Sequence, residues 1–560
     1  MRILFLCHSF NSLSQRLFIE LTQTGHEISV EFDIHDAVTE EAVALYRPDL
    51  IVAPFLKRAI PATVWRNHVC LVVHPGIKGD RGPSALDWAI LNQQSEWGVT
   101  ILQAGAEMDS GDIWAEAHFP MRLAKKSSLY RNEVTEAAVT AMLAAVAKFA
   151  AGGFVPEPLD YTRADVHGRL LPVMRQHDRA IRWNLDDTAT VLRKIHAADG
   201  FPGVLDNLYG AALNLYDARP ETNLCGTPGN LIARSDSAIC RATMDGAVWI
   251  GHLQRKSEQA ASFKLPATQV LADQPSGVAE IPESRADIQY VEKNQVGYLS
   301  FDFYNGAMGC DQCERLREAY LQACRRDVRV IVLLGGEDFW SNGIHLNLIE
   351  AAASPADESW RNINAMNDLT RAILTTDRQM TIAALRGNAG AGGVFLALAA
   401  DQVMARYGVI LNPHYQAMGN LYGSEYWTYL LPRRVGTDQA RRITENRLPL
   451  GTAHAREIGL IDACFGSNPA TFLQEVESRA ESLAAAPDYL EKLTIKQAGR
   501  VRDETIKPLA AYRAEELERM TLNFYGFDPS YHVARHHFVN KLPQSRTPRH
   551  LALHRKIGEP

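Results

Sequence analysis

Apolar runs and amphipathic stretches alternate through the first part of the chain. Residues 3–7 form an apolar run typical of a buried strand, residues 14–24 repeat apolar positions with a helical period, and residues 27–32 alternate like a strand. A helical pattern over residues 128–150 ends this stretch. The strand–helix–strand order predicts an α/β domain with a doubly wound sheet over residues 1–155.

The next segment has a different pattern. Glycines and prolines gather at residues 151–158, as in a linker, and short alternating runs follow. These runs are interrupted by Gly226, Gly229 and Gly246. The pattern predicts a small OB-like β-barrel as an accessory domain over residues 160–265.

A second α/β rhythm begins after residues 266–289, a proline-containing stretch without clear periodicity that we interpret as a linker. Apolar strands at residues 296–301 and 328–334 flank a helical stretch, so we expect a further α/β domain over residues 290–482. The remaining residues, 483–560, predict a C-terminal helical extension and carry no motif that indicates a function.

Composition narrows the class of protein. The 560 residues include 58 lysines and arginines against 65 aspartates and glutamates, a net charge of −7, which argues against nucleic acid as a partner. The apolar start at residues 3–6 is too short for a signal core or a membrane span. Eight cysteines with no leader ahead of them predict a reduced, cytoplasmic protein. Cys310-x-x-Cys313 lacks a second cysteine pair, so we expect no metal site.

One histidine and one aspartate are the candidate acid/base pair of the first domain. An apolar run at residues 71–73 leads to His74, a Pro-Gly turn follows, and a later turn supplies Asp109. An α/β sheet presents such groups at the carboxyl ends of its strands. The alternative is a packed histidine and a solvated turn aspartate. The first βα turn, residues 8–12, contains no glycine, which disfavours a dinucleotide site.

This segment resembles the catalytic segment of folate-dependent formyltransferases, which has the pattern Asn-x-His-Pro-Ser, Arg-Gly, Gly-Val-Thr and Asp-x-Gly. The resemblance implies catalytic roles for His74 and Asp109, and binding of 10-formyltetrahydrofolate near Arg81 and Gly82. The asparagine of the family, which polarises the formyl oxygen, is replaced by Val72, and an apolar side chain cannot donate a hydrogen bond. Proton transfer is thereby retained while one electrophilic group is lost. Residues 160–265 resemble the accessory C-terminal domain of methionyl-tRNA formyltransferases.

Two loops carry the candidate chemistry of the second α/β domain. One is Phe-Trp-Ser-Asn-Gly-Ile-His-Leu at residues 339–346, and the other is Arg-Gly-Asn-Ala-Gly-Ala-Gly-Gly at residues 386–393. Glycines at a strand-to-helix junction let backbone N–H groups converge on one atom, where the helix dipole adds positive potential. Close packing is the alternative explanation of the glycines.

The two loops resemble the motifs of the crotonase, or enoyl-CoA hydratase/isomerase, superfamily over roughly residues 290–470. The resemblance implies that the backbone N–H groups of Ile344 and Gly392 form an oxyanion hole for a thioester of coenzyme A. It also places Gly343 and Gly393 in the loops that bind the coenzyme.

The departures from the crotonase pattern bear on the reaction. Hydratases carry glutamates where this chain has Phe395 and His414, so a hydratase reaction loses both its base and its acid. Glu425 lies near the expected pocket and is a candidate replacement acid or base. The alternative for Glu425 is a helix-face or capping residue.

A formyltransferase half followed by a crotonase half, at this length, resembles the hydrogenase maturation family HoxX/HypX. That resemblance implies transfer of a formyl group from 10-formyltetrahydrofolate to coenzyme A, followed by decarbonylation of formyl-CoA to carbon monoxide for nickel-iron hydrogenase. The implied partners are folate, coenzyme A and the maturation machinery that receives the carbon monoxide. Two alternatives remain: a formyl-tetrahydrofolate hydrolase or formyltransferase fused to an acyl-CoA isomerase or hydratase, and a non-catalytic folate- and CoA-binding carrier.

Overall fold

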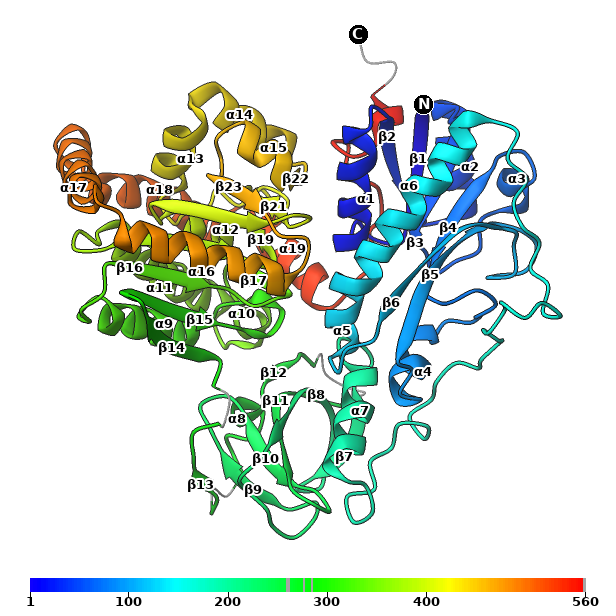
Figure 1. The fold of residues 1–560 in the computed structure, drawn as a ribbon, viewed down its shortest axis with the longest axis horizontal. Coiled ribbons are helices and arrows are strands. Elements are labelled where there is room, and N and C mark those ends of the chain that lie inside the picture. The colour runs from blue at the N-terminus through cyan, green and yellow to red at the C-terminus, as the bar shows by residue number, and fades with distance from the viewer. Residues whose placement is uncertain (258–261, 275–276, 284–285, 557–560) are drawn as a thin grey trace. The chain divides into compact units, whose positions relative to one another are not determined.

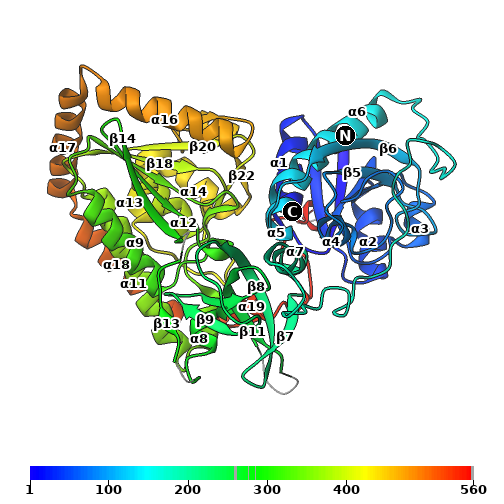
Figure 2. The same cartoon turned by 60° about the horizontal axis from the view of Figure 1, so that its bottom comes forward.

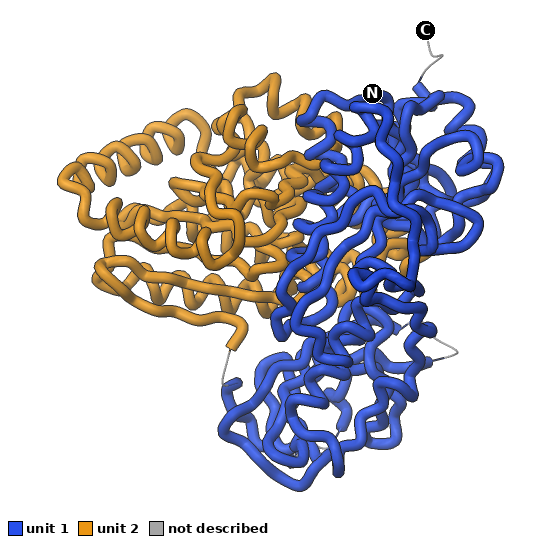
Figure 3. The backbone as a smooth tube through the Cα atoms, turned by 45° about the vertical axis from the view of Figure 1, so that its right-hand side comes forward, with its two compact units in different colours: residues 1–285, 543–560 blue, residues 286–542 orange. Residues whose placement is uncertain are grey.

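The computed structural model describes residues 1–257, 262–274, 277–283 and 286–556. The chain forms two compact units (Figure 3): residues 1–285 with 543–560, and residues 286–542. Figures 1 and 2 follow the chain through both units. Parts of the predicted linker (275–276 and 284–285) and of the predicted C-terminal extension (557–560) lie outside the described residues.

Unit 1 begins with a six-stranded sheet of order β2-β1-β3-β4-β5-β6. Its strands are β1 (Arg2–Cys7), β2 (Glu27–Phe32), β3 (Leu50–Phe55), β4 (Cys70–His74), β5 (Glu96–Gln103) and β6 (Ile113–Pro120). The first four are parallel, and β5 and β6 run antiparallel to their neighbours. Parallel pairing buries both faces, which explains why these strands are continuous apolar runs.

Helices cover both faces of this sheet. They are α1 (Ser12–Gln23), α2 (Asp36–Tyr46), α3 (Ala62–Trp65), α4 (Ala85–Leu91), α5 (Lys126–Leu129), the π-helical turn η1 (Tyr130–Val134) and α6 (Thr135–Ala151). Side chains alternate along β1: Leu4 and Leu6 pack in a cluster with α2, whereas Phe5 meets Phe18 of α1. The expected doubly wound α/β fold is thereby confirmed.

The continuous helix Lys126–Ala151 is long and apolar enough to cross a membrane by length and composition. Half of its apolar window is buried, and α6 packs against β5 and β6. A buried face of this kind is typical of a core helix in a folded domain.

The second part of unit 1 is a seven-stranded sheet covered by α7 (Thr188–Ala198). Its strands are β7 (Val204–Leu208), β8 (Ala211–Glu221), β9 (Leu231–Arg234), β10 (Ile239–Ala242), β11 (Ala247–Arg255), β12 (Leu265–Pro266) and β13 (Ala279–Glu280). Helix α8 (Ala267–Val270) packs in the core of this sheet, and β13 pairs with β9. Residues 267–270 and 279–280 of the predicted linker therefore belong to this domain, because they bury apolar side chains or complete its edge.

The end of the chain returns to unit 1 rather than continuing as helices. Val30 of β2 donates its N–H to the Leu551 carbonyl at 3.0 Å, and Phe32 donates to Thr547 Oγ1 at 2.7 Å. Buried Glu31 accepts a hydrogen bond from His554 on the short turn η3 (Leu553–Arg555). The tail therefore covers β2, the edge strand of its sheet.

Unit 2 contains two sheets, of order β14-β15-β16-β18-β20-β23 and β17-β19-β21-β22. Their strands are β14 (Ile288–Lys293), β15 (Val296–Phe301), β16 (Val330–Leu334), β17 (Phe339–Ser341), β18 (Met380–Leu385), β19 (Asn388–Gly390), β20 (Gln402–Arg406), β21 (Ile410–Asn412), β22 (Leu450–Gly451) and β23 (Ala463–Phe465). All neighbouring pairs are parallel except β14 with β15 and β21 with β22.

The helices of unit 2 pack on these sheets and on one another. They are the short turn η2 (Tyr304–Gly306), α9 (Cys310–Ala323), α10 (Leu346–Ala351), α11 (Pro355–Leu374), α12 (Gly392–Leu398), α13 (Trp427–Val435), α14 (Thr437–Asn446), α15 (Thr452–Glu457), α16 (Pro469–Ala485), α17 (Tyr489–Ile506), α18 (Leu509–Tyr525) and α19 (Ser530–Val539). Helix α16 covers one face of the larger sheet. Helix α18, from the segment without a motif, packs against α11 and α13.

Candidate active sites

His74 is the last residue of β4, at the carboxyl end of the first sheet. The loop after it is fixed on β5: Trp97 Nε1 donates to the Pro75 carbonyl at 3.0 Å, and Thr100 Oγ1 donates to the Gly76 carbonyl at 2.8 Å. A Cβ at Gly76 would collide with the imidazole of His74. The tight turn after β4 therefore needs glycine at this position.

Two carboxylates face the two ring nitrogens of His74. Asp80 Oδ2 lies 2.9 Å from Nε2, and Asp109 Oδ1 lies 3.5 Å from Nδ1. Burial by itself would lower the pKa of His74, but hydrogen bonds and charges from Asp109 and Asp80 outweigh it and raise the pKa to about 9. The site therefore holds an imidazolium at neutral pH.

The predicted pair His74 and Asp109 is thus brought together, and Arg81 and Gly82 hold the aspartate loop. The Gly82 N–H donates to Asp109 Oδ2 at 3.2 Å, and Arg81 donates to the Met108 carbonyl at 3.3 Å. Burial would raise the pKa of Asp109, but His74, the Gly82 N–H and Arg81 lower it. Asp109 is an ionised partner of the imidazolium.

Asp80 was not predicted from the sequence. Its carboxylate is 1% exposed and makes the shorter of the two contacts to His74. The signal that could have identified it is an acidic residue in the loop between His74 and the Arg81-Gly82 pair. Val72 lies two residues before His74 on the same strand, so the amide donor of the formyltransferase pattern is absent there.

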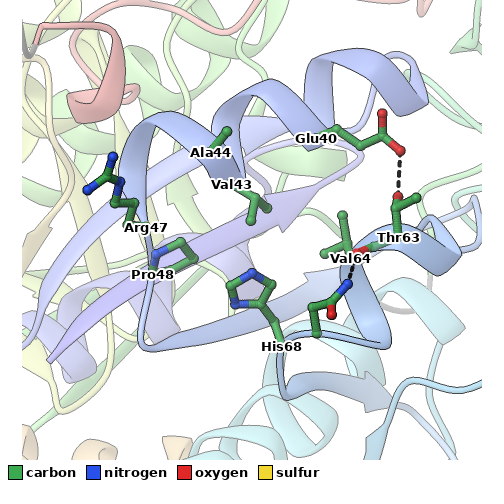
Figure 4. A pocket seen from close by; sticks show the side chains of 9 residues that line it. Glu40, Val43, Ala44, Arg47, Pro48, Thr63, Val64 and His68 are labelled. Carbon is green, nitrogen blue, oxygen red and sulfur yellow. Dashed lines mark hydrogen bonds between the residues drawn. The ribbon is translucent and has the colours of Figure 1, made fainter.

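A hollow on the surface of unit 1 lies elsewhere (Figure 4). It is lined by α2 and α3 and by Pro48 and His68, which precede β3 and β4. Thr63 donates to Glu40 across it. The hollow therefore lies toward the amino ends of these strands, whereas His74 ends β4.

The two glycine-containing loops of unit 2 lie in contact. Strands β17 and β19 pair in parallel, and Trp340 Nε1 donates to the Gly393 carbonyl at 2.8 Å. Gly343 has φ +77°, and a Cβ at this position would lie 3.4 Å from the Gly392 nitrogen. Ile344 and Gly392, the two predicted oxyanion-hole residues, are therefore brought to one place. Gly392 begins α12, where the first N–H groups lack acceptors within the helix.

Glu425 lies directly over Gly392, since a Cβ at Gly392 would collide with the Glu425 carboxyl group. Its Oε2 lies 2.5 Å from Tyr415 Oη, and Tyr415 Oη lies 2.9 Å from the Ser424 carbonyl oxygen. Burial raises the pKa of Glu425 to about 8; hydrogen bonding to Tyr415 opposes the rise, and nearby Glu516 adds to it. Glu425 is therefore a protonated acid at neutral pH.

The positions of the two hydratase glutamates are occupied differently. Phe395 is buried and stacks on Tyr415, with ring centroids 5.4 Å apart and an angle of 16° between the planes. His414 donates its N–H to the Asn412 carbonyl at 2.8 Å. Tyr415, which the sequence did not indicate, is hydrogen-bonded to the carboxyl group of Glu425.

The Cys310-x-x-Cys313 pair lies in the first turn of α9. Burial and the Glu358 carboxylate raise the pKa of Cys310 to about 12, so this thiol is protonated at neutral pH. Within the described ranges, no group of three or more His, Cys, Asp or Glu side chains could hold a metal ion.

Comparison with known proteins divides the chain in the same way. Family models match as formyl transferase over residues 26–146, as formyl transferase C-terminal domain over residues 173–268, and as enoyl-CoA hydratase/isomerase over residues 310–541. The fold and the two sites thus define a formyltransferase-like protein joined to a crotonase-like domain.

Full-length relatives narrow this class. The hydrogenase maturation factor HoxX of Bradyrhizobium diazoefficiens is 55% identical over 556 residues, 99% of this chain and 97% of that protein. The crystal structure of HypX from Aquifex aeolicus in complex with tetrahydrofolic acid is 49% identical, with a TM-score of 0.96 over 100% of both chains. A methionyl-tRNA formyltransferase of Roseiflexus sp. is 30% identical over 36% of this chain and 62% of its own. The chain belongs to the HoxX/HypX family of hydrogenase maturation factors, as its motifs indicated.

Proposed function

We propose that this protein makes carbon monoxide for the maturation of nickel-iron hydrogenase. It transfers a formyl group from 10-formyltetrahydrofolate to the thiol of coenzyme A and then splits formyl-CoA into carbon monoxide and coenzyme A. The observation that carries the proposal is Glu425, a protonated acid placed over Gly392 in a crotonase-like site without the hydratase glutamates. The tetrahydrofolic acid bound to the Aquifex aeolicus relative supports the choice of formyl donor.

In formyl transfer, the sulfur of coenzyme A bonds to the formyl carbon, and the bond from that carbon to N10 of the folate breaks. The thiol loses one proton and N10 gains one. His74 is the proton donor, because its pKa of about 9 keeps it protonated at neutral pH. Asp109 and Asp80 fix the ring and stabilise its charge. The charged ring also compensates for the amide donor that Val72 cannot supply.

In carbon monoxide release, the formyl carbon loses its proton and its bond to sulfur, and the thiolate takes up a proton. Glu425, protonated at neutral pH, gives its proton to the departing sulfur and takes up the formyl proton, which restores the acid; its pKa of about 8 is close to the ordinary thiol value of about 8.5. The N–H groups of Ile344 and Gly392 hold the thioester oxygen and orient the carbon. Gly343 and Gly393 allow the two loops to approach the coenzyme.

Water must be kept away from the formyl thioester, because hydrolysis would give formate instead. Phe395 and Tyr415 form a stacked aromatic pair at the position where a hydratase carries a water-activating carboxylate. The absence of a water-activating carboxylate at this position supports decarbonylation over hydrolysis.

The same proposal places the reaction in the cytoplasm and its product with the proteins that assemble the hydrogenase iron site. All eight cysteines are free thiols, and that state suits a reducing compartment.

The direct test supplies purified protein with 10-formyltetrahydrofolate and coenzyme A and detects carbon monoxide by the absorbance of haemoglobin. We expect carbon monoxide in step with tetrahydrofolate, and we expect His74→Ala to abolish both. Formate as the sole one-carbon product would reject the proposal. Turnover of crotonyl-CoA would instead indicate an isomerase or hydratase, and tight ligand binding without any product would indicate a carrier.

A further inference from the structure

The turn that carries Glu425 has an unusual backbone. Glu425 and the next residue, Tyr426, both have φ of +59°, and Gly423 has φ of +93°. Glycine adopts such angles freely, but two successive residues with side chains do so only when the surrounding structure holds them. The contacts of this turn therefore bear on how the acid of the site is placed.

One face of α18 holds the turn. Glu516, Met520 and Asn523 are spaced four and three residues apart, so they line the same side of the helix. Asn523 Oδ1 accepts the Tyr422 N–H at 3.0 Å, and the sulfur of Met520 lies 3.1 Å from the Gly423 nitrogen.

Glu516 makes the largest number of these contacts and is 0% exposed. Its Oε2 accepts the Tyr426 N–H at 2.9 Å and lies 3.3 Å from Ser424 Oγ. Its Oε1 accepts the N–H and the hydroxyl of Thr428, at 2.9 and 2.6 Å. The first N–H groups of α13 thus receive their cap from another helix, because Tyr426, at the cap position, supplies no side-chain bond.

The opposite side of the turn rests on α11. Asn367 Oδ1 accepts the Glu425 N–H at 2.8 Å and the Ser424 hydroxyl at 2.9 Å. Helix α18 is itself fixed to α11 by Arg513, which donates to Asp368 at 2.5 Å. The turn is therefore held by two helices of unit 2, α11 and α18, which pack against each other.

We infer that Glu516 is a positioning residue for the acid Glu425: it holds the turn so that the Glu425 carboxyl lies over Gly392, and it places a second carboxylate nearby. This inference rests on the proposed function and deepens it. It also gives a role to α18, in the segment where the sequence shows no motif.

The hydrogen bonds decide which of the two carboxyl groups carries the proton. Glu516 accepts the N–H groups of Tyr426 and Thr428, which cannot accept a proton from it, and these bonds oppose the burial that raises its pKa to about 7. Glu425 instead faces Tyr415, which has one proton and can give it to the Ser424 carbonyl while accepting from Glu425. The Cys313 thiol also interacts with the charge of Glu425, and burial raises the pKa of this thiol well above its ordinary value. The pKa of Glu516 is therefore lower than that of Glu425, so Glu516 ionises first and Glu425 remains the acid.

The test compares Glu516→Gln with the matched variant Glu515→Gln. Gln keeps the shape of the side chain, but it removes the charge and replaces one acceptor oxygen by an NH₂ group that faces N–H donors. Glu515 is exposed and pairs with Lys507 at 2.6 Å, so the control makes the same chemical change on the other side of α18.

Two readouts are needed. The first is the rate of carbon monoxide release from formyl-CoA, which we expect to fall about 10- to 100-fold in Glu516→Gln, as for other small displacements of a reacting group. The second is the infrared carbonyl band of the protonated Glu425 carboxyl, identified by its loss in Glu425→Gln. Its titration midpoint should move to lower pH in Glu516→Gln, because a negative neighbour has been removed.

Asn523→Ala separates the two effects of α18. It loosens the turn but keeps the charge of Glu516, so it should slow carbon monoxide release without moving the titration midpoint. An unchanged rate and midpoint in Glu516→Gln would overturn the inference, as would equal changes in Glu515→Gln. If the wild-type protein releases no carbon monoxide, the proposed function fails, while the infrared titration still decides whether Glu516 governs Glu425.

Discussion

Replacing Asp80 by Asn should convert the formyl-transfer site from an imidazolium to a neutral histidine. Asp80 lies 2.9 Å from His74 Nε2, and both side chains are at most 4% exposed. Asn keeps the size of the side chain and removes its charge. The pKa of His74, about 9 with both carboxylates present, should therefore fall toward its ordinary value of about 6.5.

The size of the effect on activity follows from this change. At pH 8, a group with a pKa of about 9 is about 90% protonated. If the pKa falls by about two units in Asp80→Asn, only about 10% of the protein keeps the proton at pH 8. Formyl transfer should then be about tenfold slower at pH 8 and nearly unchanged at pH 6.

The effect on stability has a definite sign. The pKa of His74 is higher in the folded than in the unfolded protein, so the two carboxylates stabilise the fold fully below about pH 6.5 and lose this effect as the pH rises through about 9. A difference of about 2.5 units corresponds to about 3 kcal/mol, and the fall of about two units in Asp80→Asn to about 2.7 kcal/mol. Asp80→Asn should therefore lower the free energy of unfolding by about 2.7 kcal/mol at pH 6 and by much less at pH 9.5.

The assay is release of tetrahydrofolate from 10-formyltetrahydrofolate and coenzyme A between pH 6 and 10, with thermal unfolding measured at both ends of the range. Asp112→Asn is the control, since Asp112 is an exposed residue of the loop that carries Asp109. If the rate of tetrahydrofolate release in Asp80→Asn still falls only near pH 9, the reasoning is refuted, because the charge of Asp80 would then have no effect on the proton of His74.

Three further perturbations have defined outcomes. Gly392→Val should stop carbon monoxide release and spare formyl transfer, because the added side chain collides with Glu425; full release in the haemoglobin assay would contradict this. Glu425→Gln should abolish release. It should also raise the free energy of unfolding of unit 2 by about 3 kcal/mol at pH 7, because the folded protein keeps Glu425 protonated at a pH roughly 2.5 units above the pKa of 4.5 at which the unfolded chain ionises. At pH 4 the carboxyl group is protonated in both states, so calorimetry at that pH should show no gain. His554→Ala removes the bonds to Ser29 and buried Glu31, which should cost about 2–3 kcal/mol and lower the unfolding temperature of unit 1; an unchanged temperature would show that the tail does not stabilise β2.

The parts of each site that depend on strand ends could be predicted from the sequence. His74 and Asp109 meet because β4 ends at one and the turn before β6 carries the other. The loops holding Ile344 and Gly392 meet because β17 and β19 are parallel neighbours. Apolar runs and glycine turns locate such ends along the chain, and the sheet then brings them together.

Residues that act through tertiary packing could not be predicted in this way. Asp80 reaches His74 only through the conformation of a tight turn, and Tyr415 is an ordinary aromatic residue until it lies beside Glu425. Glu516 lies on a helix whose sequence shows only amphipathic periodicity. Periodicity gives the buried face of α18 but not the turn that packs against it. The return of residues 543–556 to β2 was missed for the same reason.

Both sites keep a proton on a buried side chain at neutral pH, on the cation His74 in unit 1 and on the neutral acid Glu425 in unit 2. In unit 1 a cation keeps its proton because two carboxylates face it, and the pKa of His74 rises to about 9. In unit 2 a carboxyl group keeps its proton because burial and a neighbouring carboxylate raise the pKa of Glu425 to about 8.

Formyl transfer needs only the protonated form of His74, so its rate should fall above about pH 9. Carbon monoxide release begins with the protonated form of Glu425, which gives its proton to the sulfur and is restored by the formyl proton, so its rate should fall above about pH 8. Formyl-CoA should therefore accumulate between about pH 8 and pH 9, where the first step continues and the second slows.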